Sequence, residues 1–526
     1  MYGRLLCGLR RFLNEPLTAA DARESISARL ANREKLLIGL VRKTIYDNPT
    51  SPYLPLLRWA GCEFGDFERL VASTGVDAAL AGLAGQGVYV SAGEFKARTP
   101  MVRGGLTVDV RERDFDNPCL SPQVETKTGG SRSAGTRTAY DLEFLADSWS
   151  AHLVVALEAL GVRKDAPYGI WLPIMPGAGP IVLLAYTKCG FAPTKWFSPL
   201  TLQDMRPSVK SRVGTRGLLA AGRLFGARWP PPEYVAPDDA ERVARWIHDQ
   251  LRKHGACCFN SYTSTAVRVC QAAAKASLDL TGAVFLFGGE PLTRAKHEAI
   301  VRAGVSRYLV MYGSMDSGYL GLSCFSPQEC DEVHLFDDSF AFGELTRQTG
   351  PGGGSIDALL VSSLLPTTPK VLLNVETGDW GSLGKRSCGC AWDQLGLSQH
   401  MHTIRSFDKL TSEGMSFVGG NLARVLDEIL PRRFGGGIGD YQVVEEEEET
   451  GQSRLSILVS PDVGTVDEEE LVRTFLDALS IGKDHHRMMA RMWLEAKTLR
   501  VRREPPSATD AGKILPLHIK RAPRPG

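Results

Sequence analysis

The stretch that decides the fold class is Val284-Phe-Leu-Phe-Gly-Gly-Glu-Pro-Leu292. Its apolar run Val284–Phe287 predicts a buried strand, and the residues from Leu292 to Ala303 have the spacing of a helix. Pro291 stands near the start of that helix, where proline is tolerated. A strand, a glycine turn and a helix in direct succession are typical of α/β folds, and we therefore expect one here.

The same alternation continues on both sides of this stretch. Short apolar runs alternate with helical ones from about residue 85 to about residue 400, which predicts a large α/β domain. Residues 20–80 predict helices, and the region after Arg405 predicts a small α+β domain. The individual elements that the sequence predicts are the strands Val371–Val375 and Leu455–Val459 and the helices Ala20–Ile45, Asp66–Ala79, Ala240–Gly255 and Val466–Leu479.

Length and charge narrow the class of protein. The 526 residues favour about two to four domains, and 61 Lys and Arg side chains nearly balance 60 Asp and Glu side chains. Such a balance gives no reason to expect nucleic acid or an anionic membrane as a partner. The apolar run Leu5–Leu9 is too short for a signal peptide, and 11 scattered cysteines do not resemble a secreted disulfide framework. We expect a cytoplasmic enzyme without a membrane span.

A glycine loop rich in hydroxyl groups, Lys127-Thr-Gly-Gly-Ser-Arg-Ser-Ala-Gly-Thr-Arg137, is the first candidate binding element. Such a loop can present backbone N–H groups and hydroxyls to a phosphate chain. Gly130 and Gly135 have the separation of a P-loop, but Thr136 stands where that motif requires lysine. The segment is therefore not a P-loop, and by itself it fits either phosphate binding or a plain connection.

Two further segments follow predicted strands. In Met311-Tyr-Gly-Ser-Met-Asp-Ser-Gly318, the ring of Tyr312 could stack on a purine and Asp316 could hold a magnesium ion. In Thr377-Gly-Asp-Trp380, the Asp379 carboxylate could accept both hydroxyls of a ribose. Each segment taken alone is equally compatible with an ordinary loop.

The order of these segments carries more information than any one of them. The glycine loop, the Gly-Gly-Glu-Pro turn, the Tyr-Gly-Ser segment, the Thr-Gly-Asp segment and a late Gly512-Lys513 pair together resemble the adenylate-forming enzymes, and specifically their phenylacetate–CoA ligase-like group. The resemblance covers nearly the whole chain. The segments Val88-Tyr-Val-Ser-Ala-Gly-Glu-Phe-Lys96 and Phe115-Asp-Asn-Pro118 are similar to one subgroup of those ligases.

This resemblance implies a role for each matching residue. It implies that the ATP phosphates are wrapped by Ser131, Ser133, Gly135, Thr136 and Arg137. It implies that the adenine and acyl pocket is lined by Gly288, Gly289, Glu290 and Pro291. It implies that Tyr312 stacks on adenine and that Gly313 and Ser314 lie beside the α-phosphate. It also implies that Asp316 binds magnesium and that Asp379 binds the ribose. Arg405 is expected near the nucleotide, and Lys513 is expected to be the lysine of the C-terminal domain that assists adenylation.

The resemblance also implies an architecture and a reaction. We expect a large α/β domain over residues 1–403 with a helical start to about residue 80, a hinge over 404–412 near Asp408, and a small mobile α+β domain over 413–526. Adenylation needs positive charge around the phosphates, because the attacking carboxylate and the phosphate chain repel each other. A domain that swings about a hinge could deliver Lys513 and then retract to admit a thiol.

The expected substrates are a small carboxylic acid, with aromatic acids favoured by the family, together with ATP, Mg²⁺ and CoA or a carrier-protein thiol. A homodimer is compatible with this interpretation. Three alternatives stay open: transfer of the acyl group to a carrier protein or an amine, a non-catalytic relative that only binds nucleotide, and nucleotidyl activation of a substrate that is not a carboxylic acid. The second alternative rests on Asp316, where the family usually has glutamate, and on Arg137, where it usually has lysine.

Cysteine placement predicts a structural zinc site. Cys388-Gly-Cys390 lies just after the Thr-Gly-Asp segment, and Cys324 and His334 follow the Tyr-Gly-Ser segment. Thiolates with a histidine suit tetrahedral zinc, although C-x-C is tighter than the usual C-x-x-C spacing. The phenylacetate–CoA ligase-like proteins resemble this arrangement, and we expect these four residues to be the ligands.

Other donors compete for the same role. Cys330 is the rival of Cys324, and either His400 or His402 could replace His334. Ordinary buried cysteines are the alternative to a metal site altogether.

Overall fold

The computed structural model describes residues 2–127, 137–175, 177–199, 209–236, 239–348, 355–406, 410–412, 415–417, 422, 425–437, 439–447, 453–480, 493, 499–506 and 517–519. The helices are α1 (Tyr2–Asn14), α2 (Ala19–Ala31), α3 (Arg33–Val41), α4 (Tyr53–Trp59), α5 (Phe64–Thr74), α6 (Val76–Gly85), α7 (Ala92–Phe95), α8 (Leu142–Phe144), α9 (Ala151–Ala159), α10 (Gly179–Lys188), α11 (Val209–Leu224), α12 (Ala240–His254), α13 (Thr263–Lys275), α14 (Arg294–Arg302), α16 (Leu430–Phe434) and α17 (Glu468–Ser480).

The strands outside the C-terminal region are β1 (Met101–Arg103), β2 (Leu106–Val108), β3 (Val124–Lys127), β4 (Arg137–Tyr140), β5 (Tyr168–Trp171), β6 (Lys195–Ser198), β7 (Pro232–Tyr234), β8 (Cys257–Tyr262), β9 (Ala283–Gly288), β10 (Arg307–Ser314), β11 (Gly318–Ser323), β12 (Val333–Leu335), β13 (Phe340–Gln348), β14 (Ser355–Ser363), β15 (Val375–Lys385) and β16 (Gln399–Ser406). The strands that follow them are β17 (Leu410–Ser412), β18 (Met415–Phe417), β19 (Tyr441–Glu447), β20 (Ser453–Val459), β21 (Leu499–Arg502) and β22 (Leu517–Ile519).

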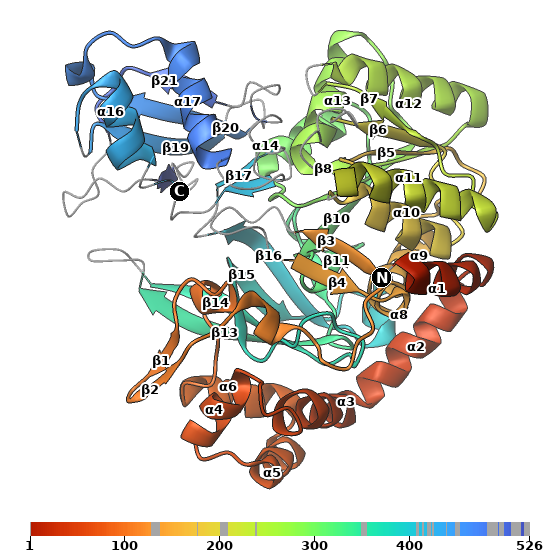
Figure 1. The fold of residues 1–526 in the computed structure, drawn as a ribbon. Coiled ribbons are helices and arrows are strands. Elements are labelled where there is room, and N and C mark those ends of the chain that lie inside the picture. Colours follow the sequence, from red (N-terminus) through yellow and green to blue (C-terminus); the bar gives the residue numbers. More distant parts are fainter. Residues whose placement is uncertain are drawn as a thin grey trace.

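A 12-stranded mixed sheet organises the large domain, in the order β13-β14-β15-β16-β12-β11-β10-β9-β8-β5-β6-β7. The strands from β10 to β7 are parallel, and those from β11 to β13 are antiparallel. Figure 1 shows α12 and α13 on one side of the parallel strands and α10 and α11 on the other. The predicted α/β class is confirmed.

The order of the parallel strands reverses between β5 and β8. From β5 the chain winds outward through β6 to β7, and from β8 it winds the other way through β9 to β10. In open α/β sheets, ligands bind at such a switch point, outside the carboxyl ends of the strands. We therefore expect a binding site at this edge of the sheet.

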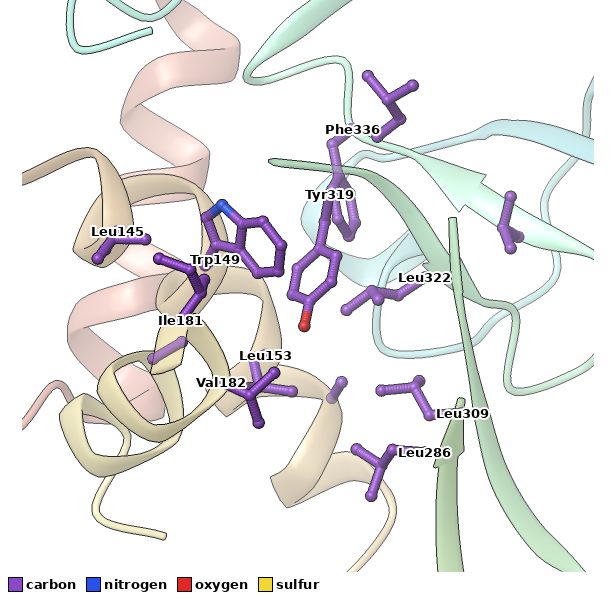
Figure 2. Packing of buried hydrophobic residues seen from close by; sticks show 14 of the residues in the cluster. Leu145, Trp149, Leu153, Ile181, Val182, Leu286, Leu309, Tyr319, Leu322 and Phe336 are labelled. Carbon is purple, nitrogen blue, oxygen red and sulfur yellow. The ribbon is translucent and has the colours of Figure 1, made fainter. Parts of the chain in front are cut away.

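The core of the large domain forms where helices α9 and α10 pack on the middle of this sheet. Figure 2 shows Trp149, Leu153 and Ile181 facing Tyr319 and Leu322 across the interface. The rings of Trp149 and Tyr319 are 4.6 Å apart at their centroids. Aromatic pairs at this separation add to the stabilisation that burial of apolar area provides.

Local sequence signals explain most of the element boundaries. Helix α12 ends at Gly255, whose φ of +68° lies in the left-handed region, and it confirms the predicted helix Ala240–Gly255. The single helix predicted over Asp66–Ala79 is wrong, because Gly75, with φ of +82°, separates α5 from α6.

The predicted strand Val371–Val375 is also wrong. Strand β15 begins only at Val375, and Asn374 before it has φ of +49°. The apolar residues of this segment are buried, but their backbone bonds to side chains and to separate segments and not to one neighbouring strand. Ser362 Oγ accepts from the Asn374 amide at 2.8 Å, and the Phe115 carbonyl accepts from the Val371 amide at 2.8 Å. The apolar run therefore reports burial and not a strand.

The C-terminal region has its own sheet and core. Its four strands lie in the order β21-β20-β19-β22, and α17 packs on them through Leu471 and Phe475. The strand predicted over Leu455–Val459 and the helix predicted over Val466–Leu479 are confirmed as β20 and α17. A small α+β unit after the large sheet is thus confirmed (Figure 1). The domain limits 403 and 413 stay predictions, and Asp408 lies outside the described residues.

Within the described part of the chain, no helix is long and apolar enough to cross a membrane.

The buried carboxyl of Asp337 makes stability depend on pH. Burial raises its pKa to about 7, in spite of Arg33 nearby, and its Oδ1 has no hydrogen-bond partner among the described residues. The pKa of Asp337 is higher in the folded state than in the unfolded state, so protonation of this carboxyl favours folding. Its contribution to the free energy of unfolding is complete below about pH 4 and is lost as the pH rises through 7.

We therefore expect the difference in unfolding free energy between Asp337→Asn and the unsubstituted protein to change by about 2–3 kcal/mol, in favour of Asp337→Asn, as the pH rises from 5 to 8. Urea unfolding at the two pH values measures this, with the exposed Asp109→Asn as the control. The other charges that face Asp337 belong to Arg33, Asp77, Asp338 and Lys385. An equal response of Asp337→Asn at both pH values would contradict the assignment.

Candidate functional site

The predicted glycine turn lies at the carboxyl end of β9. Gly288 pairs with Met311 of β10, so closely that any side chain at Gly288 would meet the Met311 carbonyl oxygen. Gly289 has φ of +79°, which glycine adopts without strain. The backbone therefore requires both glycines, and their place in an adenine and acyl pocket stays a prediction.

The carboxylate of Glu290 is turned toward the start of helix α13. It accepts hydrogen bonds from Ser264 Oγ at 2.8 Å and from the Ser264 amide at 3.1 Å. Thr263 Oγ1 donates to the Glu290 carbonyl at 3.0 Å. Glu290 thus caps this helix, whose positive end favours a carboxylate. That Glu290 and Pro291 also line the pocket stays a prediction.

Ser314 organises the turn that carries Asp316. Its Oγ accepts from the amides of Asp316 and Ser317, both at 3.2 Å, which is a serine turn. A side chain at Gly313 would collide with the backbone at Gly318, so only glycine fits there. The Asp316 carboxylate is therefore held in one place just beyond β10.

Strand β4, which directly follows the glycine loop, docks on this turn. Thr138 Oγ1 donates to Asp316 Oδ1 at 2.5 Å, and the Tyr140 hydroxyl donates to the Met315 carbonyl. The loop that is predicted to wrap the phosphates therefore ends beside the carboxylate that is predicted to hold magnesium. Neither Thr138 nor Tyr140 belongs to a motif of the sequence, and only the fold reveals their role.

Arg137, at the start of β4, pairs with Asp116 at 3.2 Å. The other residues predicted to surround the phosphates lie outside the described residues: Ser131, Ser133, Gly135, Thr136 and Lys513.

Tyr312 and Asp379 are brought together from separate strands. The Tyr312 hydroxyl donates to Asp379 Oδ2 at 3.3 Å. Burial raises the pKa of Tyr312 well above its ordinary value, so the hydroxyl keeps its proton and remains a donor. Thr377 Oγ1 accepts from the Asp379 amide at 3.1 Å, which fixes the loop. An aromatic ring beside a carboxylate suits a purine nucleoside, with the base on the ring and the ribose hydroxyls on the carboxylate.

Arg405 lies on β16, beside the strand of Asp379. In the ladder of β15 and β16, Trp380 pairs with Arg405 and Asp379 pairs with Ser406. Asp331 accepts from Arg405 Nη1 at 3.1 Å and from the amides of Thr403 and Ile404, both at 3.0 Å. Thr403 has φ of +55°, and the bonds to the buried Asp331 offset that strain. Asp331 was not indicated by any sequence motif.

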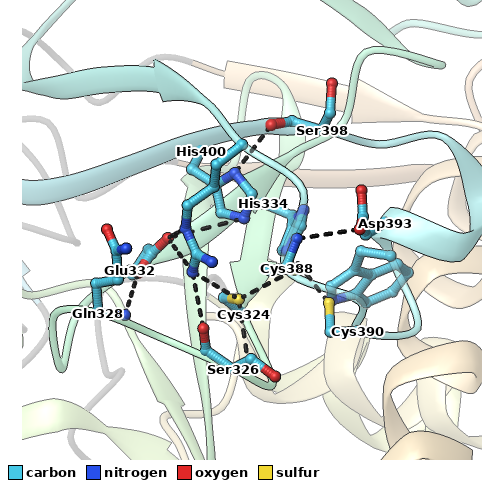
Figure 3. Close-up of polar contacts among 12 residues, drawn as sticks. Cys324, Ser326, Gln328, Glu332, His334, Cys388, Cys390, Asp393, Ser398 and His400 are labelled. Carbon is cyan, nitrogen blue, oxygen red and sulfur yellow. Dashed lines mark hydrogen bonds and ion pairs between the residues drawn. The ribbon is translucent and has the colours of Figure 1, made fainter.

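A second cluster, of cysteine and histidine, is formed by His334 on β12, His400 on β16 and the loops that follow β11 and β15 (Figure 3). The Sγ atoms of Cys324 and Cys388 are 3.8 Å apart, and Cys388 Sγ lies 3.3 Å from His334 Nε2. Cys390 Sγ lies 3.2 Å from the same nitrogen. Two thiolates on one tetrahedral zinc stand about 3.8 Å apart, so the spacing fits that ion.

The two histidines of the cluster are oriented as metal ligands are. Nδ1 of His334 donates to the Leu397 carbonyl at 2.7 Å, and Nδ1 of His400 donates to the Ser398 carbonyl at 2.9 Å. In a neutral ring with its proton on Nδ1, Nε2 is the atom that can bind a metal. His400 Nε2 is buried without a hydrogen-bond partner among the described residues, and it lies within 4.8 Å of the donor atoms of Cys324, His334 and Cys388. His400 Nε2 also lies 3.7 Å from Glu332 Oε1, beyond hydrogen-bond distance. A buried ring nitrogen beside thiols suits metal ligation.

Thiol ionisation in the cluster also suits a cation. A hydrogen bond with Cys324 lowers the pKa of Cys390, and the same bond raises the pKa of Cys324. Arg386 Nη2 approaches Cys324 Sγ at 3.5 Å and adds positive charge. Asp393 accepts from the amide of Cys388 at 3.0 Å and fixes the loop.

All four predicted zinc ligands therefore meet. Cys330 does not join them, since its Sγ faces the Leu292 carbonyl at 3.9 Å, and His402 bonds to Thr403 instead. His400 also joins the cluster beside His334, although the two histidines were expected to be alternatives. The described cysteines and histidines are compatible with a metal site that has five candidate donors.

Comparison with known proteins identifies the class of fold. No protein-family model matches the sequence, and no curated protein matches it. Among solved structures, the chain shares its fold with a CoA ligase.

One similar structure is a 2-hydroxyisobutyryl-CoA ligase solved with 2-HIB-AMP and CoA, with a TM-score of 0.52 and 14% identity over 96% of this chain and 91% of that one. An amide bond synthetase from Marinactinospora thermotolerans follows with a TM-score of 0.42 and 15% identity over 93% of each chain. A malonyl-CoA ligase solved with methylmalonyl-CoA and AMP has a TM-score of 0.40 and 14% identity over 81% of this chain and 75% of that one. At this identity the first match establishes the fold alone, and the other two scores are too low to carry an argument.

Proposed function

We propose that this protein activates a carboxylic acid with ATP as an acyl-adenylate and transfers the acyl group to a thiol such as CoA. The observation that carries the proposal is convergence at one edge of the sheet. Tyr312 contacts Asp379, and Thr138 brings the end of the glycine loop to Asp316, although these residues come from four separate strands or turns. The switch point of the parallel strands supports a ligand site at this edge.

Each group suits one part of ATP. Asp379 would accept the ribose hydroxyls while the ring of Tyr312 meets the adenine. Asp316 would hold the magnesium ion that accompanies the phosphates, and Arg137 would add positive charge near them. These residues position the α-phosphate for attack by the carboxylate of the acid, with Lys513 supplied by the C-terminal domain.

Membership of the phenylacetate–CoA ligase-like group is part of the proposal. It is supported by the Cys/His cluster, because a cluster of this composition is similar to what that group carries. We propose that the cluster binds one zinc ion through Cys324, His334, Cys388 and a fourth ligand that is either Cys390 or His400. With only protein ligands, the zinc would be structural: it would hold the ends of β11, β12 and β15 together.

Acid-dependent exchange of labelled pyrophosphate into ATP tests the reaction. Aliphatic, hydroxylated and aromatic acids form the panel, and we expect exchange with at least one of them. We expect Lys513→Ala to lower that exchange by about 100-fold or more, since it removes a charge that acts in the transition state. Lys253→Ala, an exposed lysine on α12, is the matched control and should exchange normally.

If the protein binds AMP but no acid of the panel supports pyrophosphate exchange, the result would contradict the proposal and favour a non-catalytic nucleotide-binding role. Replacing CoA by a carrier protein or an amine, once an acid is found, identifies the acceptor.

A further inference from the structure

The segment Val88–Lys96, which matches one subgroup of ligases in sequence, has no role in the site described so far. It ends in the short helix α7, which Ser91 and Glu94 cap reciprocally: Ser91 Oγ accepts from the Glu94 amide at 3.3 Å, and the Ser91 amide donates to Glu94 Oε2 at 2.7 Å. Arg103 pairs with Glu94 at 2.7 Å, and both side chains are buried. The segment is therefore rigidly built.

This segment is joined to the start of β15. The Val90 carbonyl accepts from the Glu376 amide at 2.8 Å, and Glu376 Oε2 accepts from the Ala92 amide at 3.0 Å. Glu376 stands directly before the Thr-Gly-Asp segment that carries Asp379. The position of α7 is thus fixed relative to the candidate nucleotide site.

Lys96, at the end of α7, reaches the candidate magnesium ligand. Its Nζ lies 3.9 Å from Asp316 Oδ2, and the two side chains are 21% and 8% exposed. The next residue, Ala97, has φ of +50°, which a residue with a side chain rarely adopts. Such strain is typically retained where the surrounding structure holds a functional group in place.

Cationic side chains gather around Lys96 and Asp316. Arg137 and Lys370 share one carboxylate, Asp116, at 3.2 Å and 2.7 Å. Lys96 pairs with Asp316, beside the carboxylate of Asp116 that Arg137 and Lys370 share. An anion is the ligand that such a group of charges attracts.

We propose that Lys96 binds the β- and γ-phosphates of ATP and the pyrophosphate that leaves. Without ligand, its ammonium neutralises Asp316. When magnesium and the phosphates arrive, the carboxylate turns to the metal and the ammonium turns to the phosphate oxygens, which carry more negative charge than one carboxylate.

In adenylation an oxygen of the substrate carboxylate forms a bond to the α-phosphorus, and the bond from that phosphorus to the bridging oxygen breaks. Pyrophosphate leaves with the electron pair. Lys96 stabilises the negative charge that develops on it. This role of Lys96 rests on the proposed function. Lys96 would add to the positive charge of Arg137, which Asp116 partly neutralises.

Calorimetric titration with magnesium pyrophosphate and, separately, with AMP tests the assignment without knowledge of the acid. We expect Lys96→Met to raise the Kd for magnesium pyrophosphate by about 10-fold or more and to leave the Kd for AMP within about two-fold. Lys96→Arg, which keeps the charge, should bind pyrophosphate within about three-fold of the unsubstituted protein. Lys253→Met is the matched control on an exposed helix.

Unchanged pyrophosphate affinity in Lys96→Met would overturn the proposal and leave a structural ion pair. An equal loss of AMP affinity would overturn it as well, since the whole site would then have changed. Pyrophosphate exchange separates the two proposals. If the unsubstituted protein and Lys96→Met both catalyse exchange with the same KM for pyrophosphate, Lys96 does not bind pyrophosphate, but the adenylation reaction is supported. If the unsubstituted protein binds neither AMP nor pyrophosphate, both fail.

Discussion

Replacing Asp379 by alanine is expected to raise the KM for ATP by about 100-fold or more. The carboxylate would accept both ribose hydroxyls, and each hydrogen bond to a charged group contributes about 1.5–3 kcal/mol. Two such bonds correspond to a factor of about 100 at the least, since 1.4 kcal/mol is tenfold in affinity. Pyrophosphate exchange with varied ATP measures the effect, and calorimetry with AMP measures it independently of the acid.

Two variants make the Asp379 result specific. Tyr312→Phe removes the hydroxyl that lies 3.3 Å from the carboxylate but keeps the ring, and we expect a loss of no more than about 10-fold. Asp357→Ala removes an exposed carboxylate from the neighbouring strand β14 and should leave the KM unchanged. If Asp379→Ala behaves like Asp357→Ala, the ribose is not held by Asp379.

Removal of the metal is the second change with a large expected effect. Purified protein should hold about one zinc per chain, and Cys388→Ser should hold less than about half an equivalent. Structural zinc contributes directly to folding free energy, so we expect Cys388→Ser to lower the unfolding temperature by about 5–10 °C. Metal analysis and thermal unfolding measure the two effects.

Cys330→Ser is the matched control, because Cys330 lies near the cluster in sequence and faces the Leu292 carbonyl instead. It should keep its zinc. Comparison of Cys390→Ser with His400→Ala then identifies the fourth ligand as the residue whose loss releases zinc. Full zinc content in Cys388→Ser would remove the metal assignment.

Local pattern predicted those parts of the fold that depend on local structure. The strand and glycine turn at Val284–Gly289 were predicted because an apolar run and two glycines meet there, and β9 confirms the strand. The run Val371–Val375 has the same apolar character, yet it is not a strand, because side chains such as Ser362 bind its backbone. Hydropathy alone reports burial, and the hydrogen-bond partner decides the secondary structure.

The candidate site was less predictable, because it depends on contacts between distant segments. The pairing of Tyr312 with Asp379, 67 residues apart, was implied only by the resemblance to a family. Thr138 and Lys96 were assigned no role at all, although both reach Asp316. Nothing in the residues next to Lys96 indicates that its ammonium meets a carboxylate from another strand, and such a contact requires the tertiary fold.

The ladder of β15 and β16 joins the two halves of the site. At one end Lys385 pairs with Gln399, next to the cysteine and histidine loop, and at the other end Asp379 pairs with Ser406. Some seven residues of strand span about 20 Å. Loss of zinc from the loop at one end would therefore be expected to loosen β15 and to weaken the contact that we propose between Asp379 and ATP at the other end.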